Sequence, residues 1–293
     1  MIVVQITGGL GNQMFQYAAA KSLSLHHKVE LRLDLQSFKR EILPELEVPR
    51  AFELTVFENF SYTEATLQDI KSFNSHSWLQ KRIQKILPPH KRKVYLEKQY
   101  PFDKNFYRSN KHIYLKGHRQ TEKYFARHAE EVRRIYQIKH SAIADVEGFA
   151  SEVRGFTSVA VHVRRGDYLR LPIILNWHGV LSKEYYLNAL QLIKSKFNNP
   201  RFFYFSDDIE WVEKELCSSF PGIIVSNSIS KTHLHDFYLM QSCKHQIIAN
   251  STFSWWAAWM NPNPEKIVIA PKKWFNKAPY DTRDLIPESW ISI

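Results

Sequence analysis

The sequence predicts an α/β protein of two Rossmann-like domains, each with a parallel sheet. The chain has 293 residues, which is long for one core and fits two domains of roughly 100–200 residues each. Residues 2–6 form a β-branched run that leads into a glycine-rich turn and then an apolar helical stretch at 13–25. In the second half, buried strands followed by polar loops are predicted at 158–163, 202–205 and 246–249.

The boundary between the two domains is predicted near residue 150. Residues 139–155 are periodic but polar and end in a glycine, as expected of a crossover between lobes. We therefore assign residues 1–150 to an N-terminal domain and residues 151–293 to a C-terminal domain. Within the N-terminal domain, residues 36–137 have a mixed pattern that predicts one further strand at 112–117.

The composition is that of a folded protein with a basic charge balance. Hydrophobic residues make up 44% and charged residues 24% of the chain, a proportion that supports a packed core. Lys and Arg number 40 against 29 Asp and Glu, so the formal net charge of +11 favours anionic partners such as nucleotide diphosphates, anionic lipid or nucleic acid. Basic and aromatic residues do not interleave in a recognisable module, which disfavours nucleic acid.

The N-terminus and the cysteines bear on cellular location. Residues 1–6 run directly into a glycine-rich turn without a basic leader or a long apolar span, so we interpret them as a first strand. Cys217 and Cys243 have neither metal-site nor disulfide spacing, as expected in a reducing compartment. We therefore expect a cytoplasmic protein, or one held peripherally at the inner face of the membrane.

The first polar cluster follows the first strand and contains Gly9, Gly11, Asn12 and Gln13. It is similar to a dinucleotide-binding turn, but Met14 stands where that motif has its third glycine. This difference disfavours an NAD-dependent dehydrogenase and leaves two interpretations, a tight turn that needs positive φ or a loop for another ligand. Two amides at a helix start are suited to bind hydroxyls or phosphates, so we predict a donor or acceptor loop here.

The second cluster lies at the end of the strand at 158–163. It begins with His162, and Arg164 and Arg165 follow as neighbours. Guanidinium groups match phosphate oxygens in bidentate geometry, so a diphosphate is the expected partner, with Asp167 available to hold one arginine in place. The alternative is an internal Arg–Asp ion pair without a ligand.

The third cluster, Ser206, Asp207 and Asp208, follows the aromatic strand at 202–205. A carboxylate here can accept hydrogen bonds from guanine N1–H and N2–H or from ribose hydroxyls. Alternatively, one of the aspartates caps the helix that follows. Adjacent aspartates are not an Asp-x-Asp triplet, which the sequence lacks, so a metal-dependent site is disfavoured.

The fourth cluster places small polar residues at a strand-to-helix junction: Asn250, Ser251, Thr252 and Ser254. Backbone N–H and hydroxyl groups at such a junction can bind phosphate. Helix capping alone would require one of the four. We interpret the tryptophans that follow, between 255 and 259, as core packing.

Four motifs, in this order along the chain, resemble glycosyltransferase family 11: GGLGNQMFQYA at 8–18, HVRRGDY at 162–168, FSDD at 205–208 and NSTFSWWAAW at 250–259. Members of this family are α-1,2-fucosyltransferases, so the resemblance implies a GT-B fold, in which two Rossmann-like domains face each other across a cleft. It also implies a GDP-β-L-fucose donor bound mainly by the C-terminal domain and inversion at the fucose anomeric carbon. The usual nucleophile would be the 2-hydroxyl of a galactose, and no metal would be required.

The resemblance further implies roles for single residues. Donor contacts are expected from His162, Arg164, Arg165, Ser206, Asp207, Asp208, Asn250, Ser251, Thr252 and Ser254. Catalytic roles are expected of Asn12, Arg164, Arg165 and Asp167. Within these sets the arginines would bind the donor phosphates, and one of the two adjacent aspartates would face guanine. Apart from the resemblance, the glycine-rich loop offers no carboxylate as a base, so either Asn12 orients the acceptor or a carboxylate from residues 36–137 serves.

One segment departs from the family pattern, because in Gly-His-Arg-Gln at 117–120 a histidine follows the glycine where relatives commonly have an aromatic residue. The resemblance therefore assigns no acceptor contact to residues 117–120. Animal members are membrane-anchored, whereas this chain resembles the soluble bacterial type. We expect GDP-fucose as co-substrate, a galactoside glycan as acceptor, free or lipid-linked, and no cofactor, metal or nucleic acid. The alternatives are another GDP-sugar transferase or a nucleic-acid-binding protein.

Overall fold

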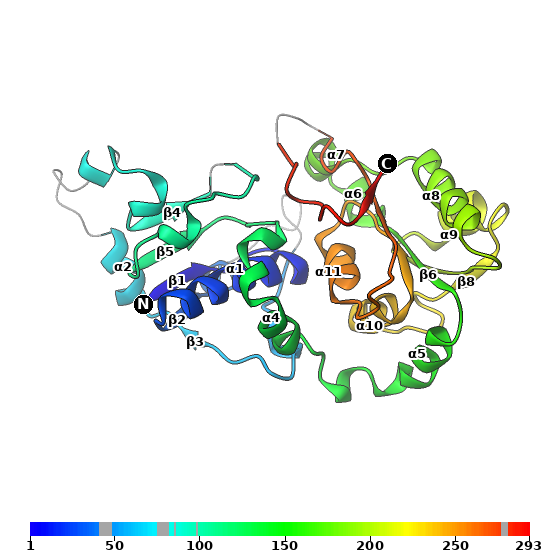
Figure 1. The fold of residues 1–293 in the computed structure, drawn as a ribbon, viewed down its shortest axis with the longest axis horizontal. Coiled ribbons are helices and arrows are strands. Elements are labelled where there is room, and N and C mark those ends of the chain that lie inside the picture. The colour runs from blue at the N-terminus through cyan, green and yellow to red at the C-terminus, as the bar shows by residue number, and fades with distance from the viewer. Residues whose placement is uncertain (41–48, 75–81, 85, 98, 277–280) are drawn as a thin grey trace. The chain divides into compact units, whose positions relative to one another are not determined.

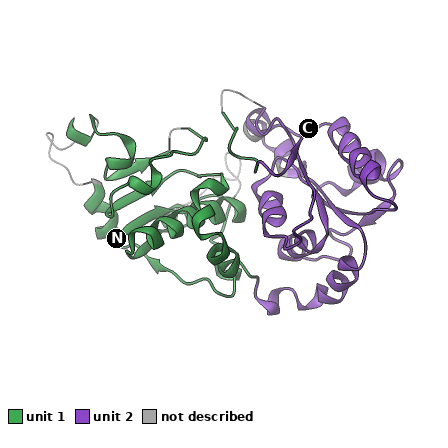
Figure 2. Ribbon diagram, in the orientation of Figure 1, with its two compact units in different colours: residues 1–137, 281–287 green, residues 138–280, 288–293 purple. Residues whose placement is uncertain are grey.

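The chain divides into two compact units (Figure 2). The computed structural model describes residues 1–40, 49–74, 82–84, 86–97, 99–276 and 281–293. Unit 1 comprises Met1–Gln137 with Asp281–Pro287, and unit 2 comprises Ile138–Tyr280 with Glu288–Ile293. The chain thus returns to unit 1 near its end, where the Asp284 carboxylate accepts hydrogen bonds from Lys123 Nζ at 2.6 Å and from Phe102 N at 2.9 Å.

The division between the units lies at residues 137 and 138, earlier than the boundary expected near 150. The reason is the packing of helix α5 (Glu147–Arg154) against helix α10 (His233–Ser242) of unit 2. Arg154 Nη2 donates a hydrogen bond to Tyr238 Oη at 2.6 Å, and Val153 is buried. The polar periodicity of this stretch therefore belongs to a surface helix of unit 2.

Unit 1 is built on a parallel five-stranded sheet in the order β3-β2-β1-β5-β4 (Figure 1). Its strands are β1 (Ile2–Gln5), β2 (Leu31–Asp34), β3 (Thr63–Glu64), β4 (Val94–Leu96) and β5 (Ile113–Lys116). Its helices are α1 (Leu10–His27), α2 (Leu67–Asn74) and α4 (Ala129–Ile135), with short 3-10 turns between them. The strands predicted at residues 2–6 and 112–117 are therefore present, while β3 and β4 are too short for the sequence pattern to have indicated them.

Helix α1 joins β1 to β2 and is the longest helix of unit 1. Gly8 has a φ of +76°, and a side chain there would lie 2.8 Å from Asn12 Nδ2, so the turn requires glycine. Met14 and Phe15 are fully buried, which anchors the helix on the sheet. The helix ends at Lys28, whose φ of 54° is the left-handed conformation common at helix C-termini.

Unit 2 is built on a parallel six-stranded sheet in the order β11-β10-β9-β6-β7-β8. The strands are β6 (Ser158–Val163), β7 (Arg201–Ser206), β8 (Gly222–Ile224), β9 (His245–Ile247), β10 (Val268–Ala270) and β11 (Ile291–Ser292). Besides α5 and α10, the helices are α6 (Gly166–Arg170), α7 (Pro172–His178), α8 (Lys183–Lys196), α9 (Ile209–Val212) and α11 (Thr252–Met260).

The core of unit 2 is formed by the continuous apolar strands and the helices against them. Val161 of β6 and Tyr204 of β7 are fully buried and lie in one cluster with Leu190 of α8. Trp255 and Trp256 are also fully buried, with ring centroids 5.1 Å apart, which confirms that the tryptophan run is packing. Two α/β units with parallel sheets confirm the predicted fold class, and in each sheet all strands end at the same edge.

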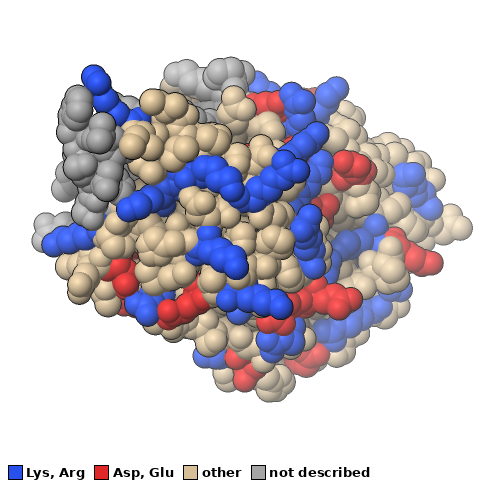
Figure 3. Space-filling model, turned by 60° about the vertical axis from the view of Figure 1, so that its left-hand side comes forward, with Lys and Arg blue, Asp and Glu red and all other residues tan. Residues whose placement is uncertain are grey.

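The face seen in Figure 3 carries both basic and acidic side chains. Figure 3 shows a band of Lys and Arg side chains across one face, with Asp and Glu side chains between and below them. Interspersed charges of both signs are typical of a solvated face. The net charge of +11 therefore does not by itself indicate one binding surface.

Candidate functional site

The carboxyl edge of the unit 2 sheet brings Arg164 and Arg165 onto the aspartates that follow β7. Strands β6 and β7 pair in parallel register up to Val163 and Ser206, so the residues after both strands meet. Arg164 Nη1 lies 3.1 Å from Asp207 Oδ2, and Arg165 Nε lies 3.0 Å from Asp208 Oδ2. The four side chains are between 17% and 27% exposed, so these ion pairs are partly shielded but open to a ligand.

Further contacts hold the two arginines. Arg165 N donates to Asp207 Oδ1 at 2.8 Å, and the Arg165 guanidinium lies 4.3 Å from the ring centroid of Trp211. A side chain at Gly166 would meet the Asp207 carboxyl group at 3.1 Å, so a glycine lets the loop approach it closely. The internal ion pair considered from the sequence thus forms, with Asp207 and Asp208 as partners. The side chain of Asp167 lies outside the part of the chain that the structure describes.

Asp208 also caps helix α9. Its Oδ1 accepts a hydrogen bond from Trp211 N at 3.2 Å, as the capping interpretation expected for one of the two aspartates. Ser206 Oγ accepts from Asp208 N at 2.9 Å, and Ser206 N donates to Ser226 Oγ at 3.0 Å. Ser206 is therefore buried in the scaffold of the loop, and contact of either aspartate with guanine stays a prediction.

A buried hydroxyl–carboxylate network beneath this loop was missed by sequence reasoning. Ser226 Oγ donates to Asp236 Oδ2 at 2.7 Å, and the Ser230 hydroxyl donates to the other carboxylate oxygen. Burial raises the pKa of Asp236 above its ordinary value. Because Ser226 also accepts from the backbone of Ser206, the network supports the end of β7. The available signal was the single acidic residue in the otherwise apolar and polar-neutral α10.

His162 lies at the end of β6 with its ring against Phe253, at 6.1 Å between centroids. The side chain is 7% exposed, and within the described residues its Nδ1 has no hydrogen-bond partner. Burial, helped by the neighbouring Arg164 charge, lowers the pKa of His162 to about 3. The ring is therefore neutral at physiological pH and adds no charge to the arginine pair.

The polar run after β9 is mostly buried, and binding of phosphate by its backbone N–H and hydroxyl groups stays a prediction. Asn250 Nδ2 donates to His178 O at 2.9 Å and to Trp274 O at 3.2 Å. The two backbone carbonyls come from different segments, and each needs a donor when it is buried. Ser254 is 1% exposed, and its hydroxyl donates to Ser251 O at 3.3 Å. Ser251 is buried as well, and Thr252, the first residue of α11, is partly exposed.

At the carboxyl edge of the unit 1 sheet, the neighbouring amide side chains of Asn12 and Gln13 have different environments. Gln13 is fully buried, and its Nε2 donates to Gly8 O at 2.8 Å and to Ala51 O at 2.7 Å, while its Oε1 accepts from Glu53 N at 2.9 Å. The Gln13 amide thus ties backbone segments together, and a donor or acceptor role of this loop stays a prediction. Asn12 is partly exposed, and its Oδ1 accepts from Gln120 Nε2 at 2.9 Å.

Gly9 and Gly11, the two glycines predicted in the ligand loop, have different backbone environments. Gly9 precedes α1 in extended backbone geometry, with φ −77° and ψ 175°, and Gly11 lies in the first turn of the helix. The positive φ expected of the turn belongs to Gly8 instead. The loop is thus a tight strand-to-helix turn that leaves Asn12, and not Gln13, at the edge of the sheet.

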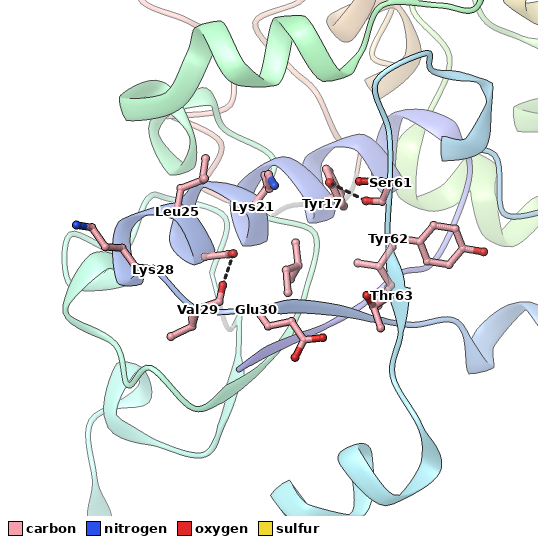
Figure 4. Close-up of a pocket in the computed structure, with 12 residues that line it drawn as sticks. Tyr17, Lys21, Leu25, Lys28, Val29, Glu30, Ser61, Tyr62 and Thr63 are labelled. Carbon is pink, nitrogen blue, oxygen red and sulfur yellow. Dashed lines mark hydrogen bonds between the residues drawn. The ribbon is translucent and has the colours of Figure 1, made fainter.

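A pocket of about 560 Å³ lies elsewhere in unit 1, along the outer part of α1 (Figure 4). Its walls include Tyr17 and Lys21 of α1 and Lys28, which directly follows that helix. Glu30 before β2 and Tyr62 before β3 also line it. Tyr17 Oη donates to Ser61 O at 3.4 Å across it. Because Lys28 and Glu30 flank the amino end of β2, this pocket is separate from the carboxyl-edge residues.

The described residues contain no group of three or more His, Cys, Asp or Glu side chains that could hold a metal ion. In the same residues, no helix is both long and apolar enough to cross a membrane.

Comparison with known proteins matches the family described as Glycosyl transferase family 11 over residues 1–293. "Alpha-1,2-colitosyltransferase" of Escherichia coli is 33% identical, covering 100% of this chain and 99% of the relative. "O-antigen biosynthesis glycosyltransferase WbnK" of Escherichia coli is 32% identical, covering 98% of this chain and 99% of the relative. "Galactoside alpha-(1,2)-fucosyltransferase 2" of Sus scrofa is 25% identical, covering 100% of this chain and 80% of the relative.

Proposed function

Because the chain belongs to glycosyltransferase family 11, we propose that it transfers L-fucose from GDP-β-L-fucose to the 2-hydroxyl of a galactose-containing glycan, with inversion and without a metal. The observation that carries this proposal is the pair Arg164 and Arg165 at the carboxyl edge of the unit 2 sheet, held by Asp207 and Asp208. The names of the relatives favour an α-1,2 linkage and, in the mammalian protein, a galactoside acceptor. The glycan is free or lipid-linked.

The proposed chemistry requires positive charge beside the donor phosphates. As the bond to fucose breaks, negative charge builds on the departing GDP, and the sugar gains oxocarbenium character. Arg164 and Arg165 are already oriented by ion pairs, and Arg165 also by the Trp211 ring, so little reorganisation is needed when the charge develops. Thr252 at the start of α11 adds backbone N–H groups to the same phosphate role. Asn12 would orient the acceptor hydroxyl from unit 1.

Colitose is the second candidate for the transferred sugar, and the colitosyltransferase relative at 33% identity favours it. Colitose is L-fucose without its 3-hydroxyl, so both sugars suit the same phosphate-binding residues. The two differ in whether the protein makes a hydrogen bond to that hydroxyl. A site built to bind a hydroxyl rejects the analogue that lacks it by orders of magnitude, whereas a site without such a bond accepts both.

The test is a donor panel with the purified full chain. GDP-fucose, GDP-colitose, GDP-mannose and UDP-galactose are each incubated with and without lactose, in EDTA, and product linkage and anomeric configuration are read by NMR. We expect transfer from GDP-fucose, faster than hydrolysis, with an α-1,2 product and no loss in EDTA. Exclusive use of GDP-colitose would replace the donor assignment. Dependence on added Mn²⁺ or Mg²⁺ would contradict metal independence, and an oligonucleotide bound more tightly than GDP would contradict the enzyme assignment.

A further inference from the structure

The inference concerns His118, and it rests on the proposed transfer to a glycan. His118 follows β5 by two residues, and β5 lies beside β1 in the parallel sheet. The turn at 117–119 therefore reaches the same edge of the sheet as the Gly8 turn and Asn12. The next residue but one, Gln120, donates to Asn12 Oδ1 at 2.9 Å, which joins the two turns.

The hydrogen bonds of Gln16 determine which nitrogen of His118 carries the proton. Thr7 N donates to Gln16 Oε1 at 2.9 Å, so the oxygen of that amide is identified and its Nε2 is the donor end. Gln16 Nε2 donates to Thr7 Oγ1 at 3.0 Å and faces His118 Nδ1 at 3.3 Å. Nδ1 is therefore the acceptor nitrogen, and the neutral ring carries its proton on Nε2.

The backbone of the turn is held independently of the ring. Both His118 N, at 2.6 Å, and Arg119 N, at 2.9 Å, donate to Glu97 Oε2, and Glu97 directly follows β4. Gly117 has a φ of +124°, and a side chain there would lie 2.4 Å from Glu97 Cβ. Glu97 can therefore lie against this turn only because residue 117 is glycine. Gln16 of α1 and Glu97 after β4 thus position the imidazole that follows β5.

The remaining ring nitrogen, Nε2, is available to a ligand. Among the residues that the structure describes, none hydrogen-bonds it, and it is not among their buried polar atoms without a partner. The side chain is partly exposed. Burial, with Arg119 nearby, lowers the pKa of His118 below its ordinary value, although the Glu97 charge opposes this. At neutral pH the group is an uncharged N–H donor.

We propose that the Nε2–H of His118 donates a hydrogen bond to one hydroxyl oxygen of the acceptor glycan and thereby helps determine which acceptor is used. An uncharged donor suits an uncharged sugar, whose hydroxyl oxygens are acceptors. The guanidinium pair of unit 2 suits the anionic diphosphate instead. His118 is thus a specificity-determining residue, and Glu97 and Gln16 are its positioning residues.

The test compares wild type with His118→Phe and His118→Gln, and uses His112→Phe as the matched control. His112 flanks the amino end of the same strand and stacks on Phe73 at 4.4 Å, a contact that phenylalanine preserves. Each protein is assayed with lactose and with a set of lactose analogues, each lacking a single hydroxyl. Calorimetric GDP affinity and donor hydrolysis without acceptor are measured alongside.

We expect His118→Phe to lower kcat/KM for lactose about tenfold, the effect of one neutral hydrogen bond and its unpaired partner, with GDP affinity and donor hydrolysis unchanged. His118→Gln should recover part of the loss, and His112→Phe should show none. One analogue should be about tenfold poorer with wild type and suffer no further loss with His118→Phe.

Two results would overturn the assignment. In the first, every analogue loses the same factor with wild type and with both His118 variants, so that no hydroxyl is coupled to the ring. In the second, the His118 variants reduce GDP affinity or donor hydrolysis as much as transfer. Failure of the proposed function is distinguishable, because wild type would then transfer no sugar from any donor in the panel to lactose, whatever residue stands at 118.

Discussion

The carboxyl edges of the two sheets carry different chemistry on the same architecture. In unit 2, Arg164 and Arg165 are charged, and Asp207 and Asp208 orient them. In unit 1, Asn12, Gln120 and His118 are uncharged hydrogen-bonding groups. A parallel α/β scaffold therefore determines where a site lies. The residues after each strand determine whether that site suits an anionic or a neutral ligand.

The two edges also differ in how their polar groups are held. Partly buried guanidinium groups need countercharges when no ligand is bound, and the two aspartates supply them. At the unit 1 edge, the Gln16 amide orients the His118 ring, and the Glu97 carboxylate accepts from the backbone N–H groups of His118 and Arg119. The predictions that follow test this contrast, from the largest expected effect to the smallest.

Replacing Arg164 or Arg165 by Ala should reduce kcat by about 2–4 kcal/mol of transition-state stabilisation, because the lost interaction strengthens as phosphate charge develops. Lysine should restore little, since it lacks the planar fork. Steady-state kinetics with the best donor measures the effect. Arg201→Ala is the control, because Arg201 begins β7 at the opposite edge and stacks on Phe156 at 3.6 Å. Near-normal turnover in both arginine variants would remove the phosphate assignment.

Gln13→Ala should destabilise the protein by about 2–3 kcal/mol, because it leaves a backbone N–H and two carbonyls without their buried partner. Asn12→Ala removes one bond at a partly exposed site and should cost at most about 1 kcal/mol of stability while lowering transfer. Urea unfolding followed by circular dichroism separates the two. Equal stability of both variants would contradict the assignment of Gln13 to the scaffold and of Asn12 to the site.

Unit 2 should lose stability in mild acid through His162. Its pKa of about 3 in the folded protein is below the ordinary value of 6.5, so the unfolded chain binds a proton first as pH falls. Stability from neutral His162 is therefore complete above pH 6.5 and declines by about 1.4 kcal/mol per pH unit below it. Between pH 7.5 and 5.5, wild type should lose about 1.4 kcal/mol more than His162→Gln. Tryptophan fluorescence reports this unit, since Trp255 and Trp256 lie in its core. Parallel pH dependence of the two proteins would contradict the prediction.

The smallest effect concerns guanine. Asp208 caps α9, and asparagine caps nearly as well, so Asp208→Asn should leave the preference for GDP over ADP unchanged. Asp207 caps no helix, so Asp207→Asn should narrow that preference about fivefold by placing a donor amide beside guanine N1–H and N2–H. Titration calorimetry with both nucleotides measures the ratio, which cancels any effect on phosphate binding. A constant ratio in both variants means that the base is recognised elsewhere.

The local patterns predicted the strands that carry the site better than those that complete the sheets. Strand β6 is buried over all six residues and β7 over its last five, and the polar residues that follow them are visible in the sequence. Strand β3 has two residues and β4 three, too few for a period to emerge. Glu97 and His118 follow β4 and β5 in the region where the pattern was weakest, so the sequence did not show that their turns meet.

The sequence by itself determined the α/β class, the repeated strand-to-loop units and the residue types at their ends, because periodicity and turn chemistry act over a few residues. Which of these side chains are buried in the scaffold, and which stay exposed at the edge of a sheet, depends on contacts between distant segments. Arg165 N donates to the carboxylate of Asp207, 42 residues away in the chain. Asn250 and Gln13 were drawn inward by backbone carbonyls from other segments. Buried backbone groups must find partners somewhere, and the partner is chosen by which segments the fold brings together.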